Sequence, residues 1–163
     1  MDVATSCVHY RTDKDIPADA VHALFRRSQW NDWFSLEDTA WYLGHTLGVI
    51  SAWSGTRAIG LATLTGDGRI SVELSTLIVD EAHRGQGIGS ELLRLAVERV
   101  AAWHPYSFKV EVFEERTELR LYGKFGFRRN TGTWLLEYGP LAEELGRRAR
   151  QMRRVEPQDA EDE

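Results

Sequence analysis

A glycine-rich turn between two apolar segments is the part of this sequence best suited to chemistry. Gly85, Gly87 and Gly89 stand at alternate positions, after the apolar residues 77–79 and before an amphipathic stretch. Glycines let the backbone curl with its N–H groups pointing inward, and a helix that begins there adds the positive end of its dipole. Arg84 adds a guanidinium that can bind two phosphate oxygens at once. Together these residues predict a site for a diphosphate group.

Two nucleotide sites are alternative interpretations of these glycines. A dinucleotide site also places glycines between a strand and a helix, and Glu111 or Glu114 follows at a suitable distance for its ribose-binding acid. However, Ser90 stands where the third glycine is expected, and the first half of the chain has no second mononucleotide-binding unit. A P-loop is excluded, because no GK[ST] sequence follows the glycines.

Short strands and helices must position this turn. Apolar alternation and turn residues predict strands at residues 3–11, 49–53, 58–65, 70–79, 108–113 and 134–138. Helical periodicity predicts helices at residues 17–28, 87–104 and 117–125, with a further helix capped by Ser35. Because residues 49–65 read as a hairpin, we expect a sheet that is mostly antiparallel.

The strand that leads into the glycine turn has an irregular apolar pattern. Val72 and Leu74 share one face, whereas Leu77 and Val79 fall on the opposite phase, so the alternation slips near Ser75. Such a slip indicates either a β-bulge, which frees backbone groups, or a strand end that is buried on both faces. The sequence leaves both alternatives open.

Length and composition predict one domain located in the cytoplasm. With 163 residues, of which 42% are hydrophobic, the chain can bury a single core. We assign this domain to residues 1–140 and expect residues 141–163 to form a basic helix and an acidic, disordered tail. No apolar run approaches the roughly 18 residues that span a membrane, and the N-terminus lacks the basic start and apolar segment of a leader.

The charge and the candidate metal ligands argue against nucleic-acid and metal binding. A net charge of −5 gives no basic surface that would displace counterions from nucleic acid. The five histidines show no ligand spacing, and no second cysteine is present to complete a zinc site or a disulfide with Cys7. We expect Cys7 to lie in the first strand as part of the core.

Two motifs identify a family resemblance. Arg84, Gly87 and Gly89 form the pattern R-x-x-G-x-G, and the sequence LYGKFGF follows at residues 121–127. In this order, with a helix and a strand between them, the motifs resemble those of the GNAT superfamily of acyl-CoA-dependent N-acetyltransferases. The resemblance implies an α/β (α+β) fold, with a mixed, mostly antiparallel sheet of roughly six or seven strands and about four helices.

The resemblance also implies how acetyl-CoA is bound. The side chain of Arg84 would contact the pyrophosphate of CoA. The backbone amides that would bind the same group belong to Gly85, Gln86, Gly87, Ile88, Gly89 and Ser90. The pantetheine arm would pair, as an added strand does, with the edge formed by Leu77, Ile78 and Val79.

Three residues have catalytic roles by this resemblance. The N–H of Leu77 would polarise the thioester carbonyl as charge develops on its oxygen. Glu73 occupies the position from which a family glutamate often removes the proton of the amine, although an ordinary solvent-facing glutamate is an equal alternative. Tyr122 matches the motif tyrosine that protonates the leaving CoA thiolate, and a packing tyrosine on a short helix is its alternative.

The chain also departs from the family pattern. Members commonly have an asparagine and an alanine where this sequence has Glu115 and Glu118. The asparagine usually helps to bind the cofactor, and a glutamate stands in its place here. A module that binds acyl-CoA without turnover is therefore an alternative function, although the presence of both Glu73 and Tyr122 argues against it.

The acceptor is expected to be the primary amine of a small molecule. Trp30, Asp32, Trp33 and Phe34 lie in the segment that covers the acceptor pocket in this fold. Aromatic rings suit an amine with an apolar body, and a carboxylate can pair with its ammonium group. Trp41 lies on a predicted helix, where a tryptophan is more often part of the core. A protein N-terminus is an alternative acceptor. Homodimers are common in the family that the chain resembles and would use an exposed sheet edge, but no feature of this sequence specifies one.

Overall fold

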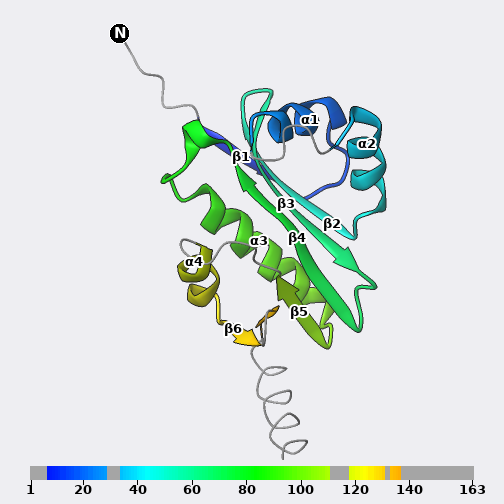
Figure 1. The fold of residues 1–163 in the computed structure, drawn as a ribbon, viewed down its shortest axis with the longest axis vertical. Coiled ribbons are helices and arrows are strands. Elements are labelled where there is room, and N and C mark those ends of the chain that lie inside the picture. Colours follow the sequence, from blue (N-terminus) through cyan, green and yellow to red (C-terminus); the bar gives the residue numbers. More distant parts are fainter. Residues whose placement is uncertain (1–6, 29–33, 111–117, 131–132, 137–163) are drawn as a thin grey trace, which may run out of the picture.

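A seven-stranded sheet organises the part of the chain that the structure describes. The computed structural model describes residues 7–28, 34–110, 118–130 and 133–136. The strand order is β1-β2-β3-β4-β5-β7-β6, and every neighbouring pair is antiparallel except β4 and β5 (Figure 1). The strands are β1 (Val8–Arg11), β2 (Gly48–Ser54), β3 (Arg57–Gly66), β4 (Ser71–Val79), β5 (Ser107–Val110), β6 (Phe127–Asn130) and β7 (Thr133–Leu136). This mixed, mostly antiparallel sheet confirms the predicted fold class.

Helices cover both faces of the sheet. On one face lie α1 (Ala18–Arg26) and α2 (Leu36–His45), and on the other lie α3 (Ile88–Trp103) and α4 (Glu118–Lys124) (Figure 1). A short 3-10 helix, η1 (Glu81–His83), connects β4 with the glycine turn. None of the described helices combines the length and apolar composition that a membrane span needs.

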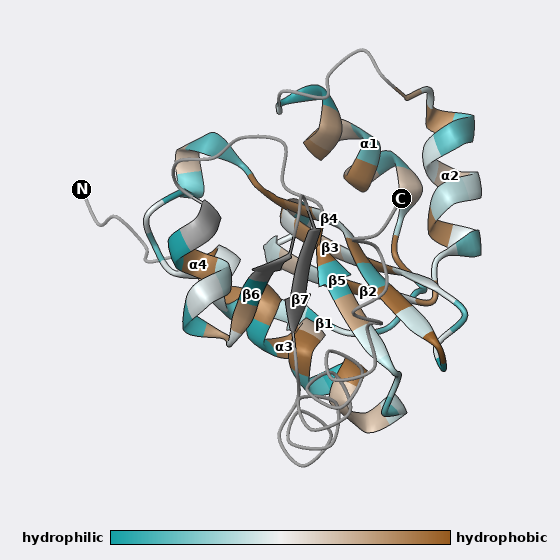
Figure 2. Cartoon of the chain, turned by 60° about the horizontal axis from the view of Figure 1, so that its bottom comes forward, coloured by the Kyte–Doolittle hydropathy of each residue, from teal (hydrophilic) through white to brown (hydrophobic). Residues whose placement is uncertain are grey.

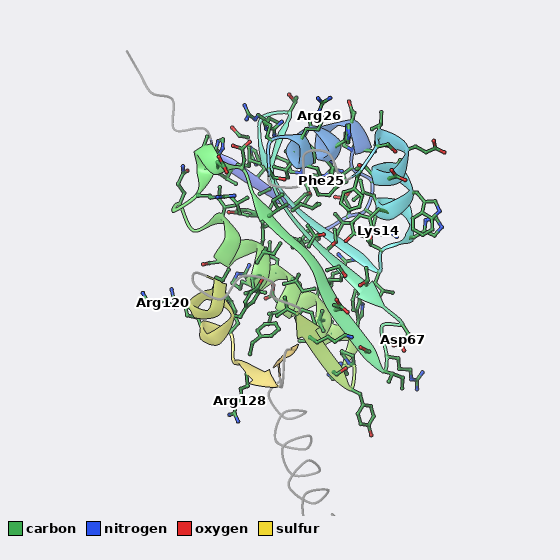
Figure 3. All side chains as sticks on the ribbon, in the orientation of Figure 1. Lys14, Phe25, Arg26, Asp67, Arg120 and Arg128 are labelled. Atoms are coloured by element: carbon green, nitrogen blue, oxygen red, sulfur yellow. The ribbon has the colours of Figure 1, made fainter. Side chains whose placement is uncertain are left out.

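Two apolar cores result from this layering. α3 packs on the sheet through apolar residues that recur at helical spacing and appear brown on its ribbon (Figure 2). On the opposite face, Phe25 points from α1 toward the sheet and is almost fully buried (Figure 3). Since both cores rest on the same strands, the two faces of the sheet are rigidly connected.

The second helix begins as the sequence predicts. The side chain of Ser35 accepts a hydrogen bond from the N–H of Asp38 at 3.0 Å, and the carboxylate of Asp38 accepts one from the N–H of Ser35 at 2.9 Å. This capping box satisfies two N–H groups that the helix itself cannot pair. The pKa of Asp38 is lowered by these hydrogen bonds.

Two predictions about buried residues are wrong. Trp41 is 63% exposed and stacks on His45, because the inward face of α2 is formed by Thr39 and Leu43 instead. Cys7 is exposed, because the first strand begins only at Val8 and none of the described strands pairs with the residue before it. Neither position could be assigned to a face until the neighbouring elements were known.

The phase slip near Ser75 is a β-bulge. In the pairing of β3 with β4, Thr63 lies opposite Thr76 and Leu64 lies opposite Leu74, so Ser75 is an extra residue on β4. Of the two alternatives that the sequence left open, a β-bulge and a strand end buried on both faces, the structure has the bulge. A bulge turns the side chains that follow it and increases the local twist of the strand.

The bulge determines which face each residue near the glycine turn occupies. Val72 lies in the core beneath α3, and Leu77 and Val79 pack against that same core. Ile78 belongs to the core beneath α1. Without the extra residue, Leu77 and Val79 would face the other way.

One strand was not predicted. β6 follows Gly126 immediately and pairs with β7 at the edge of the sheet. Its sequence, FRRN, is short and rich in arginine, so it lacks the apolar alternation that identifies a strand. Of the other predicted strands, the parts at residues 3–6, 111–113 and 137–138 lie outside the described residues.

Candidate active site

The strand before the glycine turn has one edge without a described neighbour. β5 pairs with β4 only from Ser71 to Leu74, in parallel register. None of the strands that the structure describes pairs with β4 on this side from Ser75 to Val79, whereas β3 covers the opposite edge along its whole length. Residues 75–79 of β4 thus have no described neighbour on this side, and residues 111–117, which follow β5, lie outside the described residues. This side of residues 75–79 is referred to below as the β4 edge.

The backbone groups of Leu77 and Val79 point toward the β4 edge. Asp80 donates its N–H to the carbonyl of Ile59 in β3 at 2.9 Å. Because alternate residues of a strand address the same neighbour, Ile78 also faces β3, and Leu77 and Val79 face away from it. The carbonyl of Val79 accepts a hydrogen bond from Nε of Arg84 at 3.3 Å, which agrees with this direction.

The glycine turn leaves both room and hydrogen-bond donors for an anion. Gly85 and Gly87 have φ angles of 74° and 83°, and a Cβ atom added at either residue would meet nothing within 4 Å. No side chain caps α3, and its first intrahelical hydrogen bond runs from the N–H of Glu91 to the carbonyl of Gly87. The preceding amides thus have no acceptor within the helix, as a phosphate site requires.

Arg84 lies between the β4 edge and the turn. Its side chain is exposed, and Nη1 lies 3.7 Å from a carboxylate oxygen of Glu81. An exposed ion pair of this kind stabilises the protein little and can exchange its partner at low cost. The guanidinium is therefore in a position to bind a diphosphate group on the turn.

Asp80 anchors the turn to the rest of the molecule. It is 4% exposed, and its Oδ2 accepts hydrogen bonds from Nε of Arg27 at 2.8 Å and from Nη2 of Arg57 at 2.9 Å. Its Oδ1 accepts the N–H of Ala82 at 3.1 Å, and Nδ1 of His83 lies 3.5 Å away. One carboxylate thus connects α1, β3 and η1.

The electrostatic environment keeps Asp80 charged. Burial by itself raises the pKa of a carboxyl group, but the hydrogen bonds from Arg27, Arg57 and Ala82 and the contact with His83 outweigh it, so the pKa of Asp80 is lowered. Sequence reasoning missed this cluster. No local pattern signals it, because the two arginines come from segments far away in the chain.

Glu73 forms an ion pair with a residue that the sequence did not suggest. Lys109 lies opposite Glu73 in the parallel pairing of β4 with β5, and its Nζ is 3.2 Å from Oε2 of Glu73. The two side chains are 39% and 32% exposed, respectively. Glu73 is thus neither fully solvated nor buried. Phe108 and Val110, on either side of Lys109, are buried, so the alternation of a strand puts Lys109 on the opposite face. This alternation does not identify Glu73 as the partner of Lys109.

A hydroxyl cluster lies on the same face of the sheet as Glu73. The hydroxyl of Tyr42 in α2 is 2.6 Å from Oγ1 of Thr63 and 3.0 Å from Oγ1 of Thr76. Thr63 and Thr65 share a face, and Thr65 is the partner of Glu73 in the β3–β4 register. The face beneath α2 is therefore polar beside the predicted base, whereas Leu43 of α2 and the residues beneath α1 form the apolar core of the same face.

Tyr122 is part of the core. It is 4% exposed, and its ring packs edge-on against Phe127 with 5.6 Å between the ring centroids. A Cβ atom on Gly89 would lie 3.9 Å from Cδ2 of Leu121, so α4 packs against the first turn of α3. Arg120, in contrast, points away from α4 (Figure 3). Tyr122 therefore has a packing function beside the glycine turn, and its predicted acid role stays a prediction.

The predicted acceptor residues are described only in part. Trp30, Asp32 and Trp33 lie outside the described residues. Phe34 is 40% exposed, its ring centroid is 5.7 Å from that of Phe25, and its carbonyl contacts Nε2 of His22 at 3.1 Å. The start of the helical segment over the polar face thus carries an exposed aromatic ring.

Comparisons with known proteins identify the family of this chain. Residues 17–127 match the model of the Acetyltransferase (GNAT) family. A GNAT-family acetyltransferase from Streptococcus pneumoniae has 26% sequence identity and a TM-score of 0.64, over 75% of this chain and 88% of that chain. The IAA acetyltransferase from Bacillus cereus has 27% identity and a TM-score of 0.60, over 77% of this chain and 79% of that chain.

A third structure is similar in fold alone. The ribosomal-protein-S18-alanine N-acetyltransferase from Escherichia coli has 17% identity and a TM-score of 0.65, over 77% of this chain and 80% of that chain. A comparison with curated proteins found no match. Since the family model spans well over half of the sequence, the chain belongs to the GNAT family of acetyltransferases.

Proposed function

We propose that this chain transfers the acetyl group of acetyl-CoA to the primary amine of a small molecule, by direct attack in a ternary complex. The observation that carries the proposal is the β4 edge, which leads directly into an uncapped glycine turn. An extended pantetheine arm and a diphosphate need these two features side by side. The family to which the chain belongs supports acetyl transfer as the reaction.

The residues of the turn fit the cofactor. The amides of residues 85–90 and the guanidinium of Arg84 would bind the pyrophosphate, and the backbone of Leu77 and Val79 would pair with the pantetheine arm. Bound there, acetyl-CoA supplies an acyl group activated as a thioester. Asp80 would keep the turn in place through its two arginine partners, so it is a positioning residue.

The chain's own residues then assist the transfer. Glu73 takes a proton from the acceptor ammonium, because only the neutral amine has a lone pair for attack. The N–H of Leu77 donates a hydrogen bond to the developing oxyanion, a contribution on the order of 3 kcal/mol in a dry site. Tyr122 donates a proton to the departing thiolate.

The environment of Glu73 supports an amine that approaches from the side of α2. The hydroxyl groups of Tyr42 and Thr76 are hydrogen-bonded to each other there, which makes this face polar, and the exposed ring of Phe34 lies at the start of the helical segment that covers the face. We infer a small acceptor with both polar groups and an apolar body. The second candidate acceptor is a protein N-terminus, because the fold is similar to that of the ribosomal-protein-S18-alanine N-acetyltransferase.

A thermal melt combined with an amine screen tests the proposal. Acetyl-CoA and CoA should raise the melting temperature of the full chain, whereas NAD and ATP at matched concentrations should not. Release of free thiol should then depend on an added small amine. A larger shift with NAD would mean that the glycine turn binds a dinucleotide. A CoA shift without thiol release from any amine or peptide would favour a module that only binds acyl-CoA.

A further inference from the structure

We propose that Lys109 is a self-acetylation site, modified by acetyl-CoA bound to the same chain. The inference rests on the proposed function, because it needs acetyl-CoA at the β4 edge and Glu73 as the base. Its basis is the position of an amine directly beside that base, with Nζ of Lys109 3.2 Å from Oε2 of Glu73.

Lys109 lies next to the last described residue of the pairing between the two parallel strands. The described pairs extend to Leu74 and Val110, one residue beyond the Glu73–Lys109 pair. The β4 edge begins there, and Leu77, the proposed oxyanion donor, lies three residues farther along β4. A thioester held at Leu77 would lie on the same strand as Glu73, and the flexible side chain of Lys109 contacts Glu73 from the adjoining strand.

The other lysines of the chain are placed differently. The sequence contains three lysines, Lys14, Lys109 and Lys124. Nζ of Lys14 donates hydrogen bonds to the carbonyls of Gly44 and Thr46 at 3.0 and 2.5 Å, at the end of α2. Lys124 is exposed in the last turn of α4, on the other face of the sheet. Of the three, Lys109 has a carboxylate as its ion-pair partner in the described structure.

The reaction balances without a further reagent. Glu73 takes a proton from the Lys109 ammonium, and the nitrogen lone pair forms a bond to the acetyl carbonyl carbon. The carbon–sulfur bond breaks with its electron pair on sulfur, and the thiolate takes a proton from Tyr122 or from water. The tyrosinate or hydroxide left behind takes the second proton of the nitrogen through water, so Lys109 becomes a neutral amide. The ion pair with Glu73 is thereby lost, which leaves the base free for an external amine.

Mass spectrometry of the intact full chain after incubation with acetyl-CoA tests the site, followed by peptide mapping. We expect one acetyl group, at Lys109, formed at a rate that does not depend on protein concentration, because the reaction is intramolecular. The Lys109→Arg variant should stay unmodified, whereas Lys124→Arg should react as the parent chain does. Glu73→Gln should slow the modification about 100-fold, the usual contribution of a general base.

Several results would overturn the inference. Equal labelling of Lys124 and Lys109, or an unchanged rate in Glu73→Gln, would mean spontaneous chemistry at an exposed amine. The melting temperature of Glu73→Gln with CoA checks that this variant still folds and binds. If CoA stabilises the chain and external amines are acetylated while Lys109 stays unmodified, the inference fails and the proposed function stands. If CoA does not bind, both fail.

Discussion

At the scale of single residues, Asp80 joins the most distant parts of the molecule. Replacing it with Asn removes the charge that Arg27 and Arg57 share. We expect the free energy of unfolding to fall by about 2 kcal/mol at neutral pH, less than for a fully buried pair because both guanidinium groups reach solvent. Urea unfolding measures the difference, and Asp15→Asn, at an exposed position, should change it by less than about 0.5 kcal/mol.

The pH dependence of the same variant checks the cause. The pKa of Asp80 is lowered in the folded state, so its contribution is complete above the ordinary value of 3.8 and is lost as pH falls through the lower folded value. The difference between the parent chain and Asp80→Asn should therefore shrink only below about pH 4. A difference that is constant down to pH 2 would show that the ion pairs are not its source.

Glu73 is the residue on which the catalytic proposal depends. Glu73→Gln keeps the size of the side chain but cannot accept a proton, so kcat for amine acetylation should fall about 100-fold. The matched control is Glu98→Gln, which breaks a surface ion pair of the same 3.2 Å length with Arg94 on α3. An equal loss of kcat in both variants would contradict the role of Glu73 as base.

At the scale of elements, the glycine turn is defined by its backbone. Gly87→Ala places a side chain at a φ of +83°, which costs about 1–2 kcal/mol of stability and shifts the amides that would bind pyrophosphate. We expect the affinity for CoA to fall about tenfold, which corresponds to ~1.4 kcal/mol, as measured by calorimetric titration.

A substitution at a second glycine serves as a control, because it introduces backbone strain away from the proposed CoA site. Gly55 in the β2–β3 turn also has a positive φ, +60°, and an added Cβ atom there would meet nothing within 4 Å. Gly55→Ala should thus lose a similar amount of stability while its CoA affinity is unchanged. If both variants bind CoA equally, the amides of the turn do not contact the cofactor.

At the scale of the whole molecule, one sheet carries two separate cores. Leu24 of α1 and Ile50 of β2 are fully buried on opposite faces. Leu24→Ala should lower the free energy of unfolding by about 2–5 kcal/mol, and Ile50→Val by about 0.5–1.5 kcal/mol. The double variant should unfold in one cooperative transition. Its free energy of unfolding should fall by the sum of the two single decreases, within about 0.5 kcal/mol. Two transitions on denaturation would mean that the faces unfold independently.

The sequence by itself determined the features that depend on neighbouring residues along the chain. The capping box at Ser35, the glycine turn before α3 and the slip at Ser75 each arise within a few residues, so local sterics and hydrogen bonding specify them. The two motifs at residues 84–89 and 121–127 were enough to predict the family and the kind of sheet. β6 was missed because a short arginine-rich edge strand carries no apolar alternation.

Only the tertiary structure decided which distant side chains meet. Lys109 reaches Glu73 because β5 adds to β4 in parallel and in one register, and Arg27 reaches Asp80 because α1 packs against this end of the sheet. Trp41 is exposed because α2 turns Leu43 inward. Strand order and register come from the burial of whole faces, summed over many residues, so no local pattern encodes these contacts.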